Sequence, residues 1–348
     1  MADATMSDAD ERLALAQELS QFNCAVHQPT DPVLFTPVPK PAMRPCHWRA
    51  EDVARLLEKL GASIKLEAGG NRRTLRLANP GLPYGTTPTL WASIQYILPG
   101  EIATGHRHAA TALRFVMKGS GADTIVDGEQ YVMNEGDLVL TPSWTFHDHE
   151  HKGSEPMIWL DVLDISLVRS LDGVFFEPMR EARQAVNQAV NRSYREFGSG
   201  IMRPENAHHR GPASPVLLYL HARAEAALAE AAGLEGEPFD DVLLQYQNPL
   251  TGGPALPTIG TALQMLRPGA DCKAHRHTGS SVYYVLRGEG TTCVDDLRFD
   301  WGAGDFMAIP SWAAHRHKNR SRGKEAVLFQ VNDTPVLKAL GLYREQAA

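Results

Sequence analysis

Cysteine is scarce in this chain, and its few cysteines stand far apart. They occupy positions Cys24, Cys46, Cys272 and Cys293. Because no two of them form a Cys-x-x-Cys pair, neither a zinc ribbon nor a dithiol redox site is expected, and reduced thiols are the simplest state. The acidic first residues also lack the basic-then-apolar pattern of a secretory signal. Both observations predict a cytoplasmic protein.

Long apolar runs and an excess of basic residues are also missing. No stretch of about 18 apolar residues occurs, so the sequence predicts no membrane-spanning helix. The formal net charge is −7, from 34 basic and 41 acidic residues. This balance excludes a general affinity for nucleic acid, because no cationic surplus exists to displace counterions from phosphates. The 348 residues suffice for two domains of ordinary size.

Histidine, in contrast, is abundant: the chain has fourteen, and several take part in an internal repeat. The stretch 99–108 (PGEIATGHRH) returns 169 positions later as 268–277 (PGADCKAHRH). The stretch 136–149 (GDLVLTPSWTFHDH) returns 168 positions later as 304–317 (GDFMAIPSWAAHRH). Two coincidences of this length are improbable in one chain, so we infer two copies of one structural unit.

Each copy has the residue pattern of β-structure. Strands rich in β-branched and aromatic residues are expected within 89–98, 112–133, 137–142, 259–266, 282–294 and 305–310, with an Asp-Gly hairpin at 127–128. Helices are expected only outside the copies, at 50–60, 181–197 and 217–232. The sequence predicts an all-β-dominated chain of two sandwiches or small barrels. Its expected parts are an N-terminal helical or extended segment (1–80), a first β-domain (81–180), a helical linker (181–240) and a second β-domain (241–348).

Three histidines of the first copy have the spacing of a metal site. Alternate residues of a strand point to one side, so His106 and His108 both face the interior of the barrel. A strand that ends at a proline then brings His147 across from them. Three neutral imidazoles leave other coordination positions of a divalent metal open, as catalysis requires. The alternative is a set of histidines that hydrogen-bond inside the barrel without metal, at a cost of about 1–3 kcal/mol for each unsatisfied group.

The pattern Gly-x5-His-x-His followed by Gly-x5-Pro-x4-His is the cupin signature, and it occurs twice here. It predicts a tandem double-stranded β-helix, or bicupin, with a few peripheral and linker helices. Many cupins add a glutamate ligand, but that position is Ala112 in the first copy and Ser281 in the second. The expected ligand set is therefore three histidines without a carboxylate, which leaves the full charge of the ion for anionic substrate groups.

The strings GHRHAATALRF, GDLVLTPSWTFHDH and WLDVLD, within a tandem bicupin of this length, resemble the gentisate 1,2-dioxygenase family, which also includes salicylate and 1-hydroxy-2-naphthoate 1,2-dioxygenases. The resemblance extends from about residue 45 to residue 335. It implies one Fe(II) per subunit on His106, His108 and His147, with O2 as co-substrate. It also implies a small aromatic carboxylate substrate, chelated through its carboxylate and ortho hydroxyl, whose ring opens between these two substituted carbons. The family is usually homotetrameric.

The resemblance further implies three catalytic residues beside the metal ligands. Arg114 is expected to bind the substrate carboxylate, since a planar guanidinium pairs with a carboxylate through two hydrogen bonds. The alternative for Arg114 is an exposed arginine on a strand. His149 is expected to hydrogen-bond the ring hydroxyl or the reduced oxygen at the iron, and a purely structural histidine is the alternative. Asp161 is expected to orient a neighbouring histidine or arginine.

The expected substrate pocket begins on the strand before the metal motif. Trp91, Ser93 and Gln95 alternate along this strand, so they share one face. Trp91 and Gln95 match family positions that line the pocket, and Ser93 stands where the family usually has glycine or alanine. Either Arg72 or Arg73 is expected to provide a second contact to the substrate carboxylate.

The second copy retains three histidines but differs around them. Its set is His275, His277 and His315. The counterpart of Arg114 is Tyr283, and the counterpart of Trp91 is Gly260. A mainly structural second cupin is therefore expected, and its metal content stays open.

Departures from the family pattern leave the substrate open. Phe146 stands where close gentisate enzymes have tryptophan, and Glu150-His151 where they have glycine and asparagine. Gentisate is the first expectation; a 5-substituted salicylate such as 5-nitrosalicylate, or 1-hydroxy-2-naphthoate, is the second. Two other classes of bicupin protein fit the sequence less well. A manganese-dependent oxalate-degrading bicupin needs the missing glutamate ligand, and a non-enzymatic bicupin often loses histidines that this chain keeps.

Overall fold

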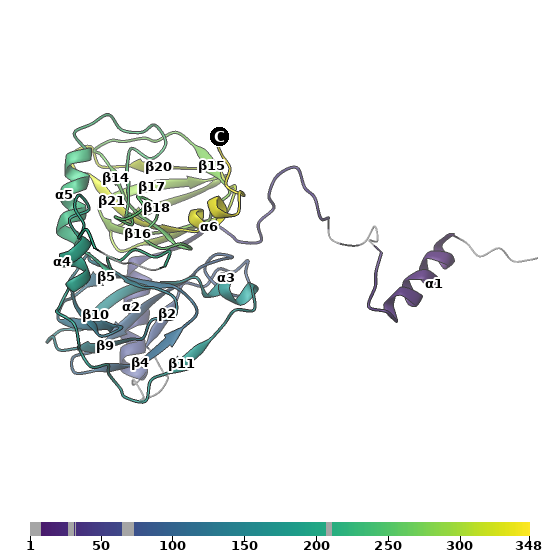
Figure 1. Cartoon of the computed structure of the whole chain (residues 1–348). Coiled ribbons are helices and arrows are strands. Elements are labelled where there is room, and N and C mark those ends of the chain that lie inside the picture. Colours follow the sequence, from purple (N-terminus) through teal and green to yellow (C-terminus); the bar gives the residue numbers. More distant parts are fainter. Residues whose placement is uncertain (1–7, 27–30, 32, 65–72, 207–210) are drawn as a thin grey trace, which may run out of the picture. The chain divides into compact units, whose positions relative to one another are not determined.

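The computed structural model describes residues 8–26, 31, 33–64, 73–206 and 211–348 (Figure 1). The chain forms two compact units, Met1–Lys40 and Pro41–Ala348. The first unit contains helix α1 (Asp8–Ser20), none of whose residues is buried. The second unit contains both β repeats. Within the described ranges, no helix combines the length and apolar character needed to cross a lipid bilayer.

The first repeat is a sandwich of two antiparallel sheets. The six-stranded sheet has the order β12 (Leu218–Tyr219), β8 (Leu138–Thr141), β5 (Ala112–Lys118), β10 (Met157–Leu163), β3 (Trp91–Ile97) and β2 (Thr74–Arg76). The five-stranded sheet has the order β11 (Phe176–Pro178), β4 (Ile102–His108), β9 (His147–His151), β6 (Ala122–Val126) and β7 (Glu129–Met133). Asp127 and Gly128 have φ values of 44° and 83°, as the expected Asp-Gly hairpin requires.

The second repeat has the same plan. Its six-stranded sheet has the order β1 (Cys46–Trp48), β19 (Phe306–Ile309), β16 (Ser281–Arg287), β21 (Ala326–Asn332), β14 (Gly260–Leu266) and β13 (Val242–Gln245). Its five-stranded sheet has the order β18 (Leu297–Gly302), β17 (Glu289–Val294), β20 (His315–Asn319), β15 (His275–His277) and β22 (Glu345–Ala347). The tandem β-sandwich that the sequence predicts is confirmed.

The repeat extends further than the sequence comparison indicated. Helix α3 (Ile165–Ser170) follows the last core strand of the first repeat, and α6 (Thr334–Ala339) follows that of the second, 169 positions later. Strands β11 and β22 begin at the same spacing. Each of these short strands pairs with the strand that carries the His-x-His pair of its repeat.

The two six-stranded sheets share one hydrophobic core. It combines residues of the first repeat, such as Ile94 and Leu160, with residues of the second, such as Leu263. Phe115 and Phe329 stack across it with ring centroids 4.0 Å apart. Stacked aromatic side chains bury a large apolar area and pack in a preferred orientation. This core therefore fixes the two sandwiches to each other.

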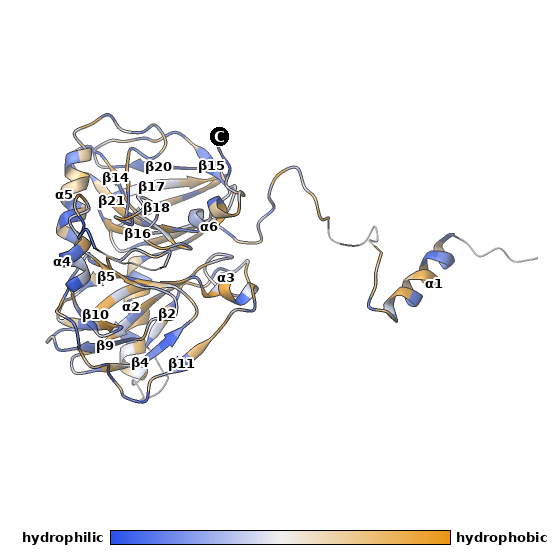
Figure 2. Cartoon of the chain, viewed as in Figure 1, coloured by the Kyte–Doolittle hydropathy of each residue, from blue (hydrophilic) through white to orange (hydrophobic). Residues whose placement is uncertain are grey.

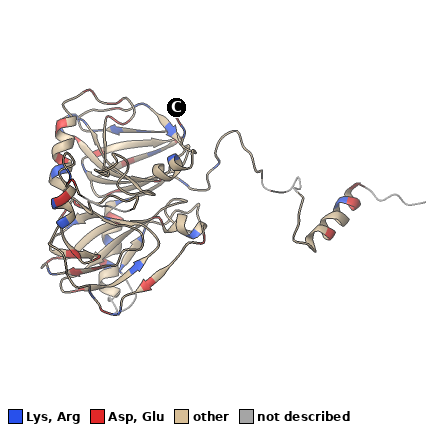
Figure 3. Ribbon diagram, viewed as in Figure 1, with Lys and Arg blue, Asp and Glu red and all other residues tan. Residues whose placement is uncertain are grey.

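The segments outside the sandwiches differ in part from the expectation. The described residues between 41 and 80 are not separate from the β-domains, because β1 joins the second repeat and β2 the first, with the expected helix α2 (Ala50–Ser63) between them. Helix α5 (His221–Ala231) confirms the expected linker helix. The helix expected over 181–197 is limited to α4 (Arg192–Phe197), whereas 181–191 is irregular. Figure 3 shows charged residues of both signs along the helices between the two repeats. In α4, Arg192 and Glu196 form an exposed ion pair.

Candidate active site

Strand β9 is unusual because it is polar and buried at once. Figure 2 shows it as a hydrophilic strand, yet four of its five residues are buried. Buried polar groups cost free energy unless they are bonded to a partner or ligand. His147 and His149 alternate with Asp148 along this strand, so the two histidines share one face and the aspartate has the other.

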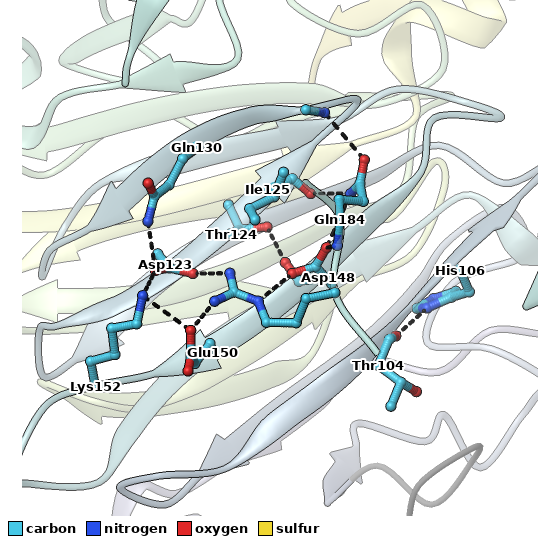
Figure 4. A network of polar contacts seen from close by, with 12 residues as sticks. Thr104, His106, Asp123, Thr124, Ile125, Gln130, Asp148, Glu150, Lys152 and Gln184 are labelled. Atoms are coloured by element: carbon cyan, nitrogen blue, oxygen red, sulfur yellow. Dashed lines mark hydrogen bonds and ion pairs between the residues drawn. The ribbon is translucent and has the colours of Figure 1, made fainter. Parts of the chain in front are cut away.

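His106, His108 and His147 form a cluster whose ligand atoms all lie within 4.8 Å of one another. Strand β4 provides the first two, and the antiparallel register places His147 opposite His106. The Nδ1 atom of each ring lies within hydrogen-bond distance of a backbone carbonyl, so each Nδ1–H can donate, and a ring held in this way binds a metal through Nε2. In the same order, the carbonyls belong to Thr104, Ala110 and Thr145, at 3.0, 2.7 and 3.0 Å. Figure 4 shows the His106–Thr104 contact.

The burial and protonation state of the His147 ring are those of a metal ligand. Its Nε2 atom is buried and has no hydrogen-bond partner among the described residues. Burial lowers the pKa of His147 well below its ordinary value, and the charges of Arg114, His106 and His108 lower it further. The ring is therefore neutral near pH 7, with its lone pair available. A buried donor atom of this kind, beside two other imidazoles, matches what a divalent transition metal requires.

A strained turn holds the third histidine in position. Trp144, three residues before His147, has a φ of 63°, a left-handed conformation that bulky residues seldom adopt. Its N–H donates to the carbonyl of His108 at 2.9 Å, which ties the turn to the His-x-His strand. The second repeat has the same device at Trp312, with a φ of 64° and a 2.7 Å bond to His277.

The opposite sheet of the sandwich presents a buried arginine to the cluster. Arg114, Asp161 and Ser93 lie side by side in register on β5, β10 and β3. Arg114 is only 2% exposed, and its Nη1 donates to Thr141 Oγ1 at 2.6 Å. Its Nε lies 3.8 Å from Asp161 Oδ1, an ion pair too long for a hydrogen bond. Since Arg114 also depresses the pKa of His147, its charge acts on the metal cluster.

The remaining predicted side chains come together around the same interior. Gln95 is 1% exposed, and neither atom of its amide has a hydrogen-bond partner among the described residues. It lies opposite Trp159 in the register. The fully buried His149 ring lies 5.4 Å from Trp159 and 6.1 Å from His147 between centroids. Trp91 is partly exposed at the end of β3.

Arg73, one of the two arginines expected to contact the substrate carboxylate, is bound to a carboxylate of the protein. Arg73 is buried, but its two terminal nitrogens bind Glu101 at 2.8 and 2.7 Å, and its Nε donates to the carbonyl of Ile64 at 2.8 Å. The structure therefore gives Arg73 a structural role in place of the substrate contact. Arg72 lies outside the described residues.

Arg76 is a site residue that sequence reasoning missed. It lies opposite Ser93 in the register of β2 and β3, and its guanidinium carbon is 4.7 Å from the centroid of the Trp91 ring. It is exposed, so it lies at the rim of the sandwich beside Trp91. Only the pairing of β2 with β3 reveals this position, and the short β2 has no pattern from which to predict it.

A second missed residue, Arg183, binds three carboxylates, of Asp123, Asp148 and Glu150. Figure 4 labels these three acidic residues. The Nε of Arg183 donates to Asp148 Oδ1 at 2.9 Å, and its terminal nitrogens bind Asp123 and Glu150. The neighbouring Ala182 accepts a 2.9 Å hydrogen bond from Gly105 N, at the irregularity in β4 just before His106. The segment around Arg183 thus holds both β4 and β9, which together carry all three histidines.

Replacing Arg183 with methionine is expected to lower the free energy of unfolding by about 3–5 kcal/mol, because Asp148 and Asp123 would keep buried charges without their main counter-ion. Metal affinity at His147 should fall as β9 loosens. Urea denaturation and metal titration measure the two effects. Arg192→Met, which removes an exposed ion pair with Glu196, is the matched control and should change stability little. Equal stability of the Arg183 variant and the unchanged chain would contradict this role.

Known proteins resemble this chain over nearly its full length. The cupin domain model matches residues 93–163 and 262–332. A 5-aminosalicylate 1,2-dioxygenase from a Comamonas species is 37% identical over 99% of this chain and 92% of that protein. A gentisate 1,2-dioxygenase from a Streptomyces species is 38% identical, with 98% and 97% covered. The crystal structure of salicylate 1,2-dioxygenase from Pseudoaminobacter salicylatoxidans with gentisate aligns with a TM-score of 0.89 at 30% identity, and covers 100% of this chain and 97% of that one. This chain therefore belongs to the gentisate and salicylate 1,2-dioxygenase family, whose members are ring-cleaving oxidoreductases built from cupin domains.

Proposed function

We propose that this protein is an Fe(II)-dependent dioxygenase that opens the ring of an ortho-hydroxybenzoate between its carboxyl-bearing and hydroxyl-bearing carbons. One observation carries the proposal: a buried guanidinium, Arg114, faces a cluster of three histidines across one sandwich interior. A cation beside a metal site selects an anionic ligand of matching size. Assembly as a homotetramer is part of the proposal and rests on the family resemblance.

His106, His108 and His147 would hold the iron, with their Nδ1 atoms bound to backbone carbonyls. When bound, a ferrous ion supplies open coordination positions and the one-electron chemistry that O2 requires. The protein's own part is to bind and orient. Arg114 pairs with the substrate carboxylate, and Asp161 keeps the guanidinium turned toward the interior. Gln95 offers an otherwise unused amide to a ring substituent.

His149 is the proposed proton-handling group. It lies on the same face of β9 as His147 and is fully buried, so it reaches the interior without belonging to the metal cluster. From this position it can accept the proton of the ring hydroxyl and hold it during cleavage. Trp159 packs against its ring and fixes its orientation.

Gentisate is the proposed substrate, with 5-aminosalicylate as the close second. Both carry an electron-donating group para to the hydroxyl, which makes the ring easier to attack by O2. Relatives named for each of these two substrates cover nearly all of this chain. The proposal therefore favours a donor at ring carbon 5 over an unsubstituted or nitro-substituted salicylate.

The test is a panel of gentisate, 5-aminosalicylate, salicylate, 5-nitrosalicylate and 1-hydroxy-2-naphthoate, each given to the Fe(II)-loaded protein under air. Oxygen consumption and the absorbance of the ring-opened product report turnover. We expect the two donor-substituted acids to have the highest kcat/KM. A higher kcat/KM for salicylate or 5-nitrosalicylate than for the two donor-substituted acids, or no oxygen consumption with any of the five, would contradict the proposal.

Ser93 is expected to influence which substituent the pocket accepts. It is 3% exposed and lies in register between Asp161 and Arg76, on the pocket face of β3. Replacing Ser93 with alanine should lower kcat/KM for gentisate relative to salicylate by about 3- to 10-fold, the loss of one hydrogen bond. The ratio of the two kcat/KM values measures this effect. An unchanged ratio would place the ring substituent elsewhere in the pocket.

A further inference from the structure

The second cupin brings two ring nitrogens close together. The Nε2 atoms of His275 and His315 lie 3.0 Å apart, and both side chains are buried. His315 Nδ1 lies 3.0 Å from the carbonyl of Ala313, so this nitrogen carries the proton and Nε2 presents a lone pair toward His275. On its other side, the His275 ring has a carboxylate oxygen of Glu345 3.5 Å from Nδ1.

A metal ion fits the observed spacing of these two nitrogens. A metal about 2.1 Å from each nitrogen would see two nitrogens 3.0 Å apart at an angle of about 90°. Such an angle suits octahedral ions better than a closed tetrahedral site. His277 completes the cluster: the ligand atoms of the three histidines all lie within 4.8 Å of one another.

Glu345 distinguishes this cluster from the one in the first cupin. The repeat offset of 169 relates Glu345 to Phe176, whose ring stacks on His106 with centroids 5.3 Å apart. In the second cupin the same strand position carries a carboxylate beside His275. A carboxylate behind a ligand histidine fixes its tautomer and raises its basicity, and so strengthens metal binding.

The second cupin lacks the residues that are proposed to bind an aromatic acid beside the metal of the first cupin. The pair Arg114–Asp161 of the first cupin corresponds to Tyr283 and Gln330, which hydrogen-bond to each other at 2.7 Å. The counterpart of Gln95 is Gln264, whose amide nitrogen donates to Asp240 Oδ1 at 3.0 Å. The protein thus supplies carboxylates of its own, Asp240 and Glu345, around His275. Like charges disfavour a second anion in this place.

We propose that the second cupin binds its own divalent transition-metal ion on His275, His277 and His315, and that this ion is structural: it fastens the C-terminal segment 342–348 to the barrel. Strand β22 in this segment pairs with β15, which carries two of the three histidines, and Figure 1 shows the C-terminus beside β15. Thr278 and Ala348 extend the pairing through backbone bonds to Arg344 and Ala274 at 2.9 Å each.

The test uses the full-length chain, stripped of metal by a chelator and titrated with Co2+. We expect two Co2+ per chain in the unchanged protein and one in His147→Ala, which keeps only the second site. The double variant His147→Ala/His315→Ala should bind none. Glu345→Gln should keep the stoichiometry but weaken the second site about 10-fold. Hydrogen exchange of 342–348 should slow when Co2+ is added to His147→Ala.

Two outcomes overturn the proposal: a His147→Ala chain that binds no Co2+, or exchange in 342–348 that Co2+ leaves unchanged. The first of these does not depend on whether the His315 variants fold. Ring cleavage separates this proposal from the proposed function, because His315→Ala should lose one metal and still turn over gentisate at the normal rate. Loss of turnover together with that second metal would show that the ion is not merely structural.

Discussion

Replacing His147 with alanine is expected to lower the rate of ring cleavage by more than about 10³-fold, because the loss of a ligand removes the metal and the several kcal/mol of stabilisation that it provides. His147 is the proposed ligand that links the two halves of the site: it lies on β9, opposite the His106–His108 strand, and its Nε2 is buried without a hydrogen-bond partner among the described residues. Oxygen consumption with gentisate and metal analysis of the same sample measure the effect.

The internal repeat provides a matched control for this variant. His315 occupies the corresponding position of the second cupin, 168 residues later, and is equally buried. His315→Ala should therefore leave ring cleavage unchanged while it removes a similar side chain from a similar barrel. Equal activity of the His147 variant and the unchanged protein, or equal losses in both variants, would contradict catalysis in the first cupin.

Replacing Arg114 with methionine is expected to lower kcat/KM by about 10²- to 10³-fold while metal content stays unchanged. The buried guanidinium provides a charge-assisted pair with the substrate carboxylate, and loss of such a pair costs about 2–5 kcal/mol. Arg114→Lys should recover only part of this loss, since an ammonium keeps the charge but not the planar pair of donors. Steady-state kinetics with gentisate, beside metal analysis, measure the effect.

Tyr283 is the counterpart of Arg114 and provides the control for that experiment. Tyr283→Phe removes the hydroxyl that accepts a hydrogen bond from Gln330 in the second cupin, and should leave kcat/KM unchanged. A normal kcat/KM for Arg114→Met would mean that the substrate carboxylate binds elsewhere. The exposed Arg76, stacked on Trp91, would then be the next residue to replace.

The sequence predicts the features that repeat or alternate. The 168- and 169-residue offsets predict two sandwiches, and the alternation His106–His108 predicts a shared interior face, because both follow from strand geometry alone. The apolar residues around Arg114 also predict its burial. What the family resemblance adds is the role of each side chain.

The features that escaped prediction depend on contacts between distant segments. Arg183 and Gln184 lie in a stretch of helical composition, yet they bond to Asp148 on β9, so tertiary contacts prevail over local propensity there. The sequence makes Arg73 a candidate for a substrate contact, but in the structure Arg73 binds Glu101, from the turn after β3. β22 is too short and polar to be recognised as a strand, and only its pairing with β15 brings Glu345 to His275.

The most direct test of the central claim is the stoichiometry of the reaction with gentisate. Fe(II)-loaded protein is mixed with gentisate in a closed oxygen-electrode cell without added reductant. The mass of the product is then measured by mass spectrometry. We expect one O2 consumed per gentisate and a product heavier by both oxygen atoms, with the ring absorbance lost. A product that gains a single oxygen atom, or a reaction that proceeds only with an external reductant, would contradict ring cleavage at this site.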